Sequence, residues 1–287
     1  MTDAGRRPIA LVTGASSGIG RATVLRLLAA GWTVFAGLRD PRVYDRLLEE
    51  DPALGRRLVP TVFEMTDREQ IADAARLIDA RLDGHGIDAL VNNAGMAIVG
   101  PLELVPLEDF REAFEVNLFG HIAVTQALLP QLRRTKGRIV FVSSIARRLQ
   151  PPYSAPYSAS KAAYDAAGNV LRAELRQSGI QVALLEPGSV STGIWEKSHT
   201  RAKQMLIPDD VSEIYRHVPQ VLDRVVNAGR RHAISPDTVA TAVERALNAR
   251  RMRPYYVIGL DAHFVVWARR LLPQSVCDRI LTRALGA

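Results

Sequence analysis

Tyr157 and Lys161 stand four positions apart in a segment of helical character. Residues at positions i and i+4 share one face of a helix, so the phenol and the ammonium lie close together. A free tyrosine has a pKa of about 10, and a neighbouring positive charge favours the phenolate and lowers that pKa. Such a tyrosine can give or take a proton near neutral pH. The pair predicts a proton-transfer site, although a single pair of this kind also occurs on many helix surfaces.

A glycine-rich turn follows the first apolar run of the chain, with glycines at Gly14, Gly18 and Gly20. Because glycine has no Cβ, the backbone can turn sharply and approach a pyrophosphate closely. The helix that follows offers free N–H groups and the positive end of its dipole. The turn therefore predicts a dinucleotide phosphate site, with a spacing that differs from the common G-x-G-x-x-G.

These motifs together resemble the short-chain dehydrogenase/reductase family, whose fingerprint is T-G-x3-G-x-G. The sequence continues with N-N-A-G at residues 92–95 and with Asn117, Ser144, Tyr157 and Lys161, in the family's order. The resemblance extends over about residues 8–195. It implies hydride transfer between a nicotinamide cofactor and a carbonyl/alcohol pair, and the layout is similar to that of hydroxysteroid and retinol dehydrogenases.

The resemblance implies a role for each member of the catalytic set. Tyr157 gives a proton to the developing alkoxide, and Lys161 supports it and bonds the nicotinamide ribose. Ser144, chosen over its neighbour by its spacing from the tyrosine, donates a hydrogen bond to the substrate oxygen. Asn117 holds a water molecule that links Lys161 to solvent.

The resemblance also implies a set of cofactor contacts. The glycine-rich turn lines the phosphates, and the ends of the third and fourth strands approach the adenine and its ribose. A segment resembling P-G-x-V-x-T after the sixth strand holds the carboxamide. The residues assigned in this way are Gly14, Ser16, Ser17, Gly18, Ile19, Gly20, Glu64, Met65, Asn92, Ala94, Gly95, Pro187, Gly188, Val190 and Thr192, together with Tyr157 and Lys161.

The end of the second strand bears on the choice between NADP and NAD. Leu38 stands where an NAD-selective aspartate is expected, and Arg39 follows it. An arginine offers a planar fork of donors to a 2′-phosphate. The sequence therefore predicts NADP(H), with NAD(H) as the alternative cofactor. In that alternative Arg39 faces solvent and Asp40 holds the ribose.

Short apolar runs alternate with stretches of helical periodicity, which implies parallel βαβ units. The predicted strands are Ile9–Val12, Thr33–Ala36, Val59–Phe63, Ala89–Val91, Arg138–Val142, Val182–Leu185 and Tyr255–Ile258. The predicted helices include Arg21–Ala30, Arg68–Leu82, Leu107–Leu129 and Ala155–Ser178. We expect an α/β fold: a single-domain Rossmann-type doubly wound parallel sheet with a C-terminal helical extension.

Within a single domain over residues 1–287, we expect a core over 8–192, a substrate lid over 193–235 and a helical tail over 262–287. Trp195 and Met205 suggest an apolar pocket under the lid, and ordinary helical packing is the alternative. The arginine-rich tail can lie on a membrane surface, cover the cleft or pack in a dimer; Pro273 interrupts it and favours packing. A bulky apolar alcohol, ketone or aldehyde is the expected substrate.

The composition of the chain excludes several classes of partner. The net charge is +7, but the basic residues are scattered and not interleaved with aromatics, which argues against nucleic acid. One cysteine, Cys277, excludes an internal disulfide, and the dispersed histidines predict no metal site. No apolar window is long enough to span a membrane, so a cytoplasmic protein is expected. Family members usually pair through the helices carrying Asn117 and Tyr157, which implies a homodimer or homotetramer.

Two other functions fit the same fold. An epimerase or dehydratase usually keeps the tyrosine and lysine but carries other substrate loops. An NADPH sensor binds the cofactor without turnover. The intact set of Asn117, Ser144, Tyr157 and Lys161 argues against a sensor, because a sensor does not need a proton relay.

Overall fold

Seven parallel strands form a single sheet in the computed structural model, which describes residues 6–203, 207–224 and 233–285. The sheet order is β3-β2-β1-β4-β5-β6-β7, and every pairing is parallel. The strands are β1 (Ile9–Thr13), β2 (Thr33–Leu38), β3 (Leu58–Val62), β4 (Ala89–Asn92), β5 (Arg138–Val142), β6 (Gln181–Pro187) and β7 (Tyr255–Ile258). The predicted fold class and all seven predicted strands are confirmed.

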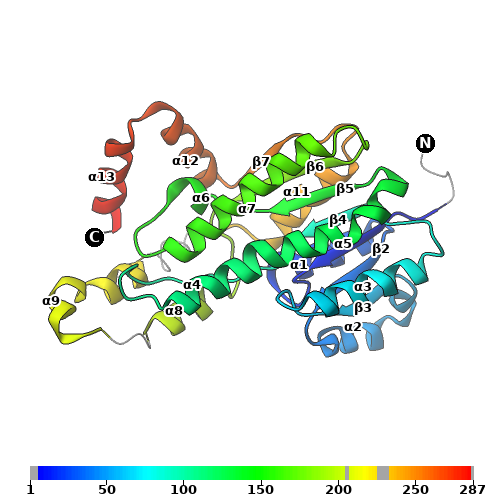
Figure 1. The fold of residues 1–287 in the computed structure, drawn as a ribbon, viewed down its shortest axis with the longest axis horizontal. Coiled ribbons are helices and arrows are strands. Elements are labelled where there is room, and N and C mark those ends of the chain that lie inside the picture. Colours follow the sequence, from blue (N-terminus) through cyan, green and yellow to red (C-terminus); the bar gives the residue numbers. More distant parts are fainter. Residues whose placement is uncertain (1–5, 204–206, 225–232, 286–287) are drawn as a thin grey trace.

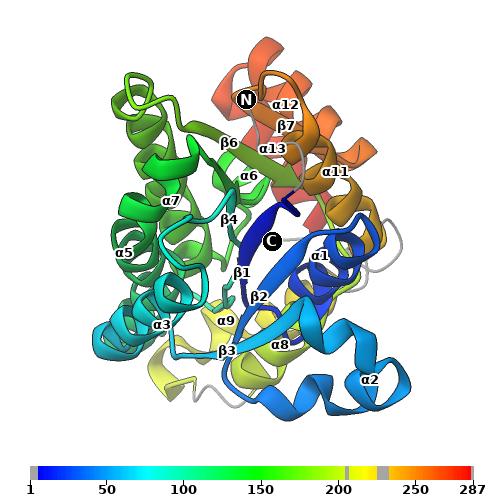
Figure 2. The same cartoon turned by 90° about the vertical axis from the view of Figure 1, so that its right-hand side faces the viewer.

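Helices cover both faces of this sheet (Figure 2). One face carries α3 (Arg68–Arg81), α5 (Gly120–Thr135) and α7 (Ala155–Glu174), and the other carries α1 (Gly18–Ala29) and α11 (Pro236–Asn248). Alternate strand residues point to opposite faces, so each strand contributes to two apolar cores. Leu11, Leu90 and Ile139 belong to the first core, and Val12, Val91 and Val140 to the second.

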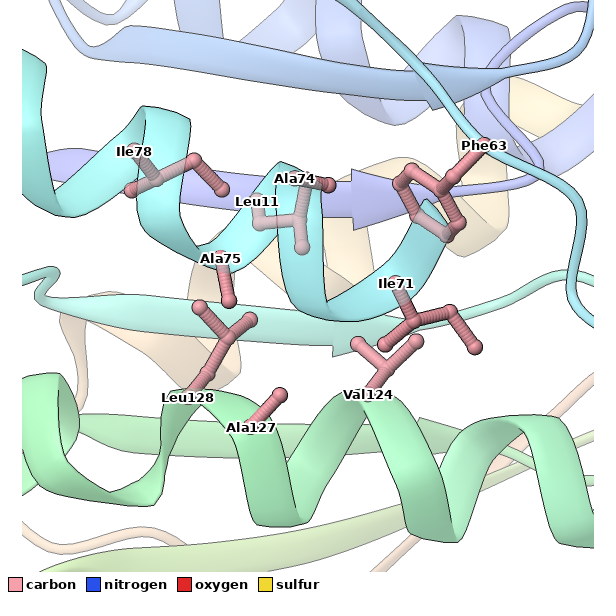
Figure 3. A pocket seen from close by; sticks show the side chains of 9 residues that line it. All are labelled: Leu11, Phe63, Ile71, Ala74, Ala75, Ile78, Val124, Ala127 and Leu128. Carbon is pink, nitrogen blue, oxygen red and sulfur yellow. The ribbon is translucent and has the colours of Figure 1, made fainter. Parts of the chain in front are cut away.

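The first core contains a small gap between β1, α3 and α5 (Figure 3). It is lined by Leu11, Phe63, Ile71, Ala74, Ala75, Ile78, Val124, Ala127 and Leu128. All of these side chains are apolar, so the gap offers no hydrogen-bonding group that could orient a cofactor or a polar substrate.

The predicted helix Leu107–Leu129 is wrong in its continuity and in its end. The structure has α4 (Leu107–Phe114), a π-helical turn over Glu115–Phe119, and then α5. A π turn inserts an extra residue into a helix and is frequent at functional sites. Pro130 does not end the helix, which runs on to Thr135 and closes at Lys136 in the left-handed conformation.

The remaining elements are short. Helices α2 (Asp45–Glu50) and α6 (Ala146–Leu149) follow β2 and β5, and 3₁₀ turns lie at Pro41–Tyr44, Pro52–Arg56 and Asp209–Val211. Asp67 caps α3 by accepting hydrogen bonds from the backbone N–H groups of Glu69 and Gln70.

The carboxyl ends of the strands meet at one edge of the sheet, which is where ligands bind in open α/β folds. Beyond that edge lie α8 (Ile194–Lys203), α9 (Ser212–Tyr215), α12 (Leu260–Leu271) and α13 (Gln274–Leu285) (Figure 1). The segments predicted as lid and tail therefore lie at the same end of the sheet. Part of the predicted lid, residues 204–206 and 225–232, and the ends of the chain lie outside the described residues.

Candidate active site

Tyr157 and Lys161 lie on α7 and are both nearly inaccessible to solvent. Helix α7 starts at Ala155 with Pro156 in its first turn, a position that suits proline. The Lys161 ammonium donates to the Val142 carbonyl at 3.1 Å and lies 4.8 Å from the centre of the Tyr164 ring. Burial lowers the pKa of Lys161 to about 8. The lysine is therefore the more easily deprotonated of the two groups.

Burial raises the pKa of the Tyr157 phenol in the ligand-free protein. A hydrogen bond with Ser144 opposes this rise only in part. The lowering of this pKa that was expected from Lys161 does not appear in the ligand-free protein, where loss of hydration is the largest cause of the shift. The phenol is consequently protonated at neutral pH. The effect of Lys161 with the cofactor bound stays a prediction.

Ser144 follows β5 and places its hydroxyl against the Tyr157 phenol. Its Oγ also accepts a hydrogen bond from the Ala146 N–H at 3.1 Å, which fixes the side chain at the start of α6. Among the described residues, the neighbouring Ser143 hydroxyl is buried without a hydrogen-bond partner. The serine beside the phenol is thus the one that the spacing predicted.

Asn117 lies in the π turn between α4 and α5 and is fully buried. Its amide donates to the Met96 carbonyl and the Ser160 hydroxyl, and its oxygen accepts from the Met96 N–H. A Cβ on Gly95 would lie 3.2 Å from the Asn117 oxygen and 3.7 Å from the Lys161 nitrogen. Asn117 therefore joins α7 to the loop after β4 at the catalytic lysine, and the predicted water remains a prediction.

Thr13 and Asn93 connect the loop after β4 to the glycine-rich turn. The Thr13 hydroxyl accepts from the N–H groups of Asn93 and Ala94, and the Asn93 amide donates to the carbonyls of Thr13 and Gly14. A Cβ on Gly20 would lie 2.6 Å from the Asn93 amide nitrogen. The T-G motif and the N-N-A-G motif are thus joined by hydrogen bonds into one local structure.

Asn92 is fully buried and positions the loop after β4, and its predicted contact with the cofactor stays a prediction. Its amide donates to the Thr125 hydroxyl at 2.9 Å, and its oxygen lies 3.2 Å from Nδ1 of His121. His121 contacts the Ala94 carbonyl through Nε2 at 2.7 Å and is itself fully buried. Burial and the charge of Lys161 lower the pKa of His121 to about 3. The neutral His121 ring therefore holds the loop after β4 through its contacts with Asn92 and Ala94.

The glycine-rich turn fits a dinucleotide phosphate group. Gly14 and Gly18 have φ values of +65° and +51°, and a Cβ on Gly14 would lie 2.7 Å from the Ala94 Cα. Ser16 and Ser17 are exposed, and the Ser17 hydroxyl makes no capping bond to α1. The first turn of α1 holds no acidic residue. Free N–H groups and hydroxyls at a helix N-terminus suit an anion.

A buried tyrosine, Tyr44, holds this turn in place. Its hydroxyl donates to the Ala15 carbonyl at 2.7 Å from the 3₁₀ turn after β2. The sequence analysis missed it, because no motif marks a residue that reaches the turn from a loop 29 positions away.

Arg39 extends from the end of β2 with 78% of its side chain exposed. Within the described part of the chain its charge partner is Glu64, at 3.7 Å, and that pair is open to solvent. Asp40, the alternative ribose ligand, instead caps a 3₁₀ turn and pairs with Arg42, which lowers the pKa of the carboxyl. The exposed Arg39 guanidinium can therefore bind an added anion, whereas the Asp40 carboxylate is already paired with Arg42.

The end of β3 departs from the predicted adenine contact. One oxygen of Glu64 accepts from the N–H of Met65, and the Met65 side chain is buried. Gly120 at the start of α5 allows the close approach, since a Cβ there would lie 2.3 Å from the Met65 carbonyl. Contact between these two residues and a cofactor stays a prediction.

The loop after β6 is connected to α12 through Asp261. The carboxylate accepts from the Ser189 N–H at 2.7 Å and occupies the space beside Gly188, where a Cβ would lie 2.1 Å from its oxygen. Glycine at 188 makes room for this carboxylate, and its predicted contact with the cofactor stays a prediction. At the far end of the loop, a Cβ on Gly18 would lie 3.0 Å from the Thr192 methyl, so loop and glycine-rich turn are neighbours.

Gly188→Ala is expected to disturb this loop, because the added methyl collides with the Asp261 carboxylate. We expect kcat/KM to fall about 10- to 100-fold through misplacement of the loop, with about 1–3 kcal/mol lost in unfolding free energy. Gly55→Ala is the matched control, since the nearest atom to its added Cβ is 3.9 Å away. Steady-state kinetics with urea unfolding measure both, and equal effects of the two changes would contradict the role given to Asp261.

The segment predicted as a lid covers the catalytic tyrosine. The Trp195 ring meets the Tyr157 ring edge-on, with 5.3 Å between their centres. Trp195 also packs against the apolar cluster of Val99, Val218 and Leu222. Arg201 on α8 pairs with two carboxylates of α4, which holds α8 in place. Met205, the other residue predicted to line the pocket, lies outside the described residues.

Among the described residues, no group of three or more histidine, cysteine or acidic side chains could hold a metal ion. The side chains that the structure brings together here are a phenol, an ammonium and a hydroxyl.

Comparisons with known proteins agree with this geometry. Residues 8–203 match the family model described as short chain dehydrogenase. An NADPH-dependent 3-dehydrocapnine reductase from Ornithobacterium rhinotracheale is 33% identical, with 96% of both chains covered. A 17-beta-hydroxysteroid dehydrogenase type 6 from Bos taurus is 33% identical, covering 95% of this chain and 87% of its own. A short chain dehydrogenase from Burkholderia cenocepacia solved in complex with NADP superimposes with a TM-score of 0.73 at 28% identity, covering 96% of this chain and 98% of that one.

Proposed function

The chain belongs to the short-chain dehydrogenase family and is an oxidoreductase, and on that premise we propose that it reduces a carbonyl group on a bulky apolar substrate with NADPH. The observation that carries the proposal is the arrangement of Tyr157, Ser144 and Lys161. A buried phenol with a serine hydroxyl beside it lies on the same helix as a buried lysine, at the carboxyl end of the sheet.

Ser144 and Tyr157 have separate roles at the carbonyl oxygen. When bound, NADPH supplies the hydride. The Ser144 hydroxyl donates a hydrogen bond to the carbonyl oxygen, which stabilises the charge that develops there. Tyr157 gives its phenolic proton to the same oxygen, and its raised pKa keeps that proton in place until it is needed.

Lys161 and the glycine-rich turn would hold the cofactor. The turn and the α1 N-terminus suit the pyrophosphate, and Lys161 bonds a ribose hydroxyl beside Tyr157. The loop from Pro187 to Thr192 holds the carboxamide. Arg39 binds the 2′-phosphate, which is the basis for proposing NADP(H) over NAD(H).

Arg39→Ala is expected to raise the KM for NADPH about 30-fold and leave the KM for NADH within a few-fold. The guanidinium–phosphate bond contributes about 2 kcal/mol, and NADH has no phosphate at this position. Arg42→Ala is the matched control, because Arg42 is as exposed but pairs with Asp40. Equal changes for the two cofactors would contradict the assignment.

An apolar substrate is supported by the residues packed around Tyr157. Ala97, Ala146, Ile194 and Trp195 form apolar and aromatic surface there. The bovine relative is named as a hydroxysteroid dehydrogenase, and a steroid is a bulky apolar molecule.

A panel of ketones and aldehydes, followed at 340 nm with NADPH, tests the proposal. Steroid, retinoid and long-chain ketones are expected to give a kcat/KM at least tenfold above that of acetone or cyclohexanone, since burial of apolar surface contributes about 25 cal/mol per Å². A preference for small polar carbonyls would remove the apolar-substrate part of the proposal. No turnover in either direction, with NADPH bound, would favour a sensor.

The assembly and the division of the chain are part of the same proposal. A single domain carries the core over 8–192, the lid over 193–235 and the tail over 262–287. Pairing through the helices of Asn117 and Tyr157 is supported by Phe119 and Val170, apolar residues exposed by 43% and 57% on those helices. Light scattering that finds a monomer would contradict this pairing.

A further inference from the structure

The outer face of α12 is a row of large apolar side chains open to solvent. Leu260, Phe264, Trp267 and Leu271 are 89%, 62%, 57% and 58% exposed. Their spacing places all four on one side of the helix, a stripe about 16 Å long at 1.5 Å per residue. An apolar patch of this kind on a folded protein marks a surface that meets a partner.

The opposite side of α12 is firmly attached to the body of the protein. Ala262 is fully buried, and the Asp261 carboxylate accepts from the Ser189 N–H in the loop after β6. Arg269 donates to the carbonyls of Arg148 and Leu149 beside α6. These contacts hold α12 with its apolar stripe facing outward. Helix α12 lies at the upper left of the molecule in Figure 1.

Basic side chains accompany the stripe. Arg270 is exposed on α12, and Arg279 and Arg283 are exposed on α13 on either side of the exposed Ile280. The acidic residues of the same segment are Asp261, which is bonded to the core, and Asp278, which accepts from Gln274. The stripe therefore lies in a region of positive charge.

We propose that α12, with the arginines of α13, docks on the surface of an anionic lipid membrane. Aromatic and leucine side chains on one side of a helix, flanked by arginines, are the pattern of a helix that lies in the interface of a bilayer. A second copy of this chain fits less well, because a two-fold contact would bring the same arginines of two positively charged chains together. Within the described ranges, no helix is long and apolar enough to cross a membrane, so the contact is peripheral.

Co-sedimentation of the full chain with vesicles tests this docking. The protein is expected to sediment with vesicles of phosphatidylcholine and phosphatidylglycerol, and about fivefold less for each arginine removed in Arg270→Gln, Arg279→Gln and Arg283→Gln. The triple change Phe264→Ser, Trp267→Ser and Leu271→Ser is expected to weaken binding at least about 30-fold, since buried apolar area drives insertion. NADPH oxidation and the Tm of each variant check that the fold is intact.

Leu77→Ser is the matched control, because Leu77 is 46% exposed on α3, far from α12. It is expected to sediment like the wild type. Wild-type protein left in the supernatant with anionic vesicles would overturn the proposal, as would a triple serine variant that sediments unchanged. The proposal would also fail if light scattering showed that the triple change splits a dimer, because the stripe would then be a contact between copies. Single serine variants repeat the test if the triple variant unfolds.

Discussion

Replacing Tyr157 by phenylalanine is expected to lower kcat for carbonyl reduction about 10²- to 10⁴-fold, the range in which a positioned general acid contributes. Phenylalanine keeps the ring that packs edge-on against Trp195 but removes the proton and the bond to Ser144. The Kd of NADPH, measured by fluorescence, is expected to change less than tenfold. The loss should therefore appear in kcat and leave cofactor binding nearly intact.

Tyr153→Phe is the control for this change. This change also removes a hydroxyl, one that lies 2.9 Å from Nε2 of His217. Tyr153 packs against the cluster of Val99, Val218 and Leu222 and is not paired with Ser144. Its kcat is expected to stay within a few-fold of the wild type. Activity above a tenth of the wild-type value in Tyr157→Phe would mean that another group delivers the proton.

Lys161→Met is expected to lower kcat/KM for NADPH about 100-fold and to change its pH dependence. In the wild type, this ratio should fall as pH rises through about 8, where the buried lysine loses its charge. The ratio kcat/KM reports the ionisations of the ligand-free enzyme. Its decrease above about pH 8 should therefore be absent in Lys161→Met. Lys136→Met, at an exposed position, should keep the wild-type profile. A profile unchanged in Lys161→Met would show that another group titrates there.

The same lysine predicts how stability depends on pH. Its pKa is lowered in the folded protein, so between about pH 8 and the unfolded value of about 10.4 the unfolded chain binds more protons. The free energy of unfolding attributable to Lys161 therefore rises with pH across this window and is lost as pH falls through 8. Urea unfolding of Lys161→Met should lack this rise.

Local patterns made the sheet and the glycine-rich turn predictable. Strand runs such as Ile9–Val12 are short, apolar and followed by turn residues, and this information is contained in neighbouring positions. The helix around Asn117 was predicted as continuous, because nothing in its periodicity marks a π turn. Tyr157 and Ser144 were found through their spacing, whereas the raised pKa of the phenol depends on burial that the sequence does not display.

Long-range contacts could not be predicted. Asp261 reaches Ser189 across 72 positions, and His121 reaches Ala94 across 27. Such pairs exist only once the crossovers have brought the strand ends together. No motif marks either residue.

The ion pairs of Arg147 and Arg148 also could not be predicted from local patterns. The two arginines contribute to the net charge of +7, but only 14% of the Arg147 side chain is exposed. Arg147 pairs with Asp165 at 2.9 Å and with the fully buried Glu186, which Arg148 also contacts at 3.0 Å. These ion pairs tie α6, and therefore Ser144, to β6 and α7. A composition count cannot separate such buried charges from surface ones.

Transfer of deuterium from NADPH labelled at C4 of the nicotinamide tests the central claim most directly. The reaction uses whichever ketone the panel identifies, with the 4R and 4S labels run separately. We predict one deuterium on the carbinol carbon of the product from one of the two labels, and none from either label in Tyr157→Phe over the same time. A carbinol product that carries no deuterium from either label would contradict direct hydride transfer from the nicotinamide.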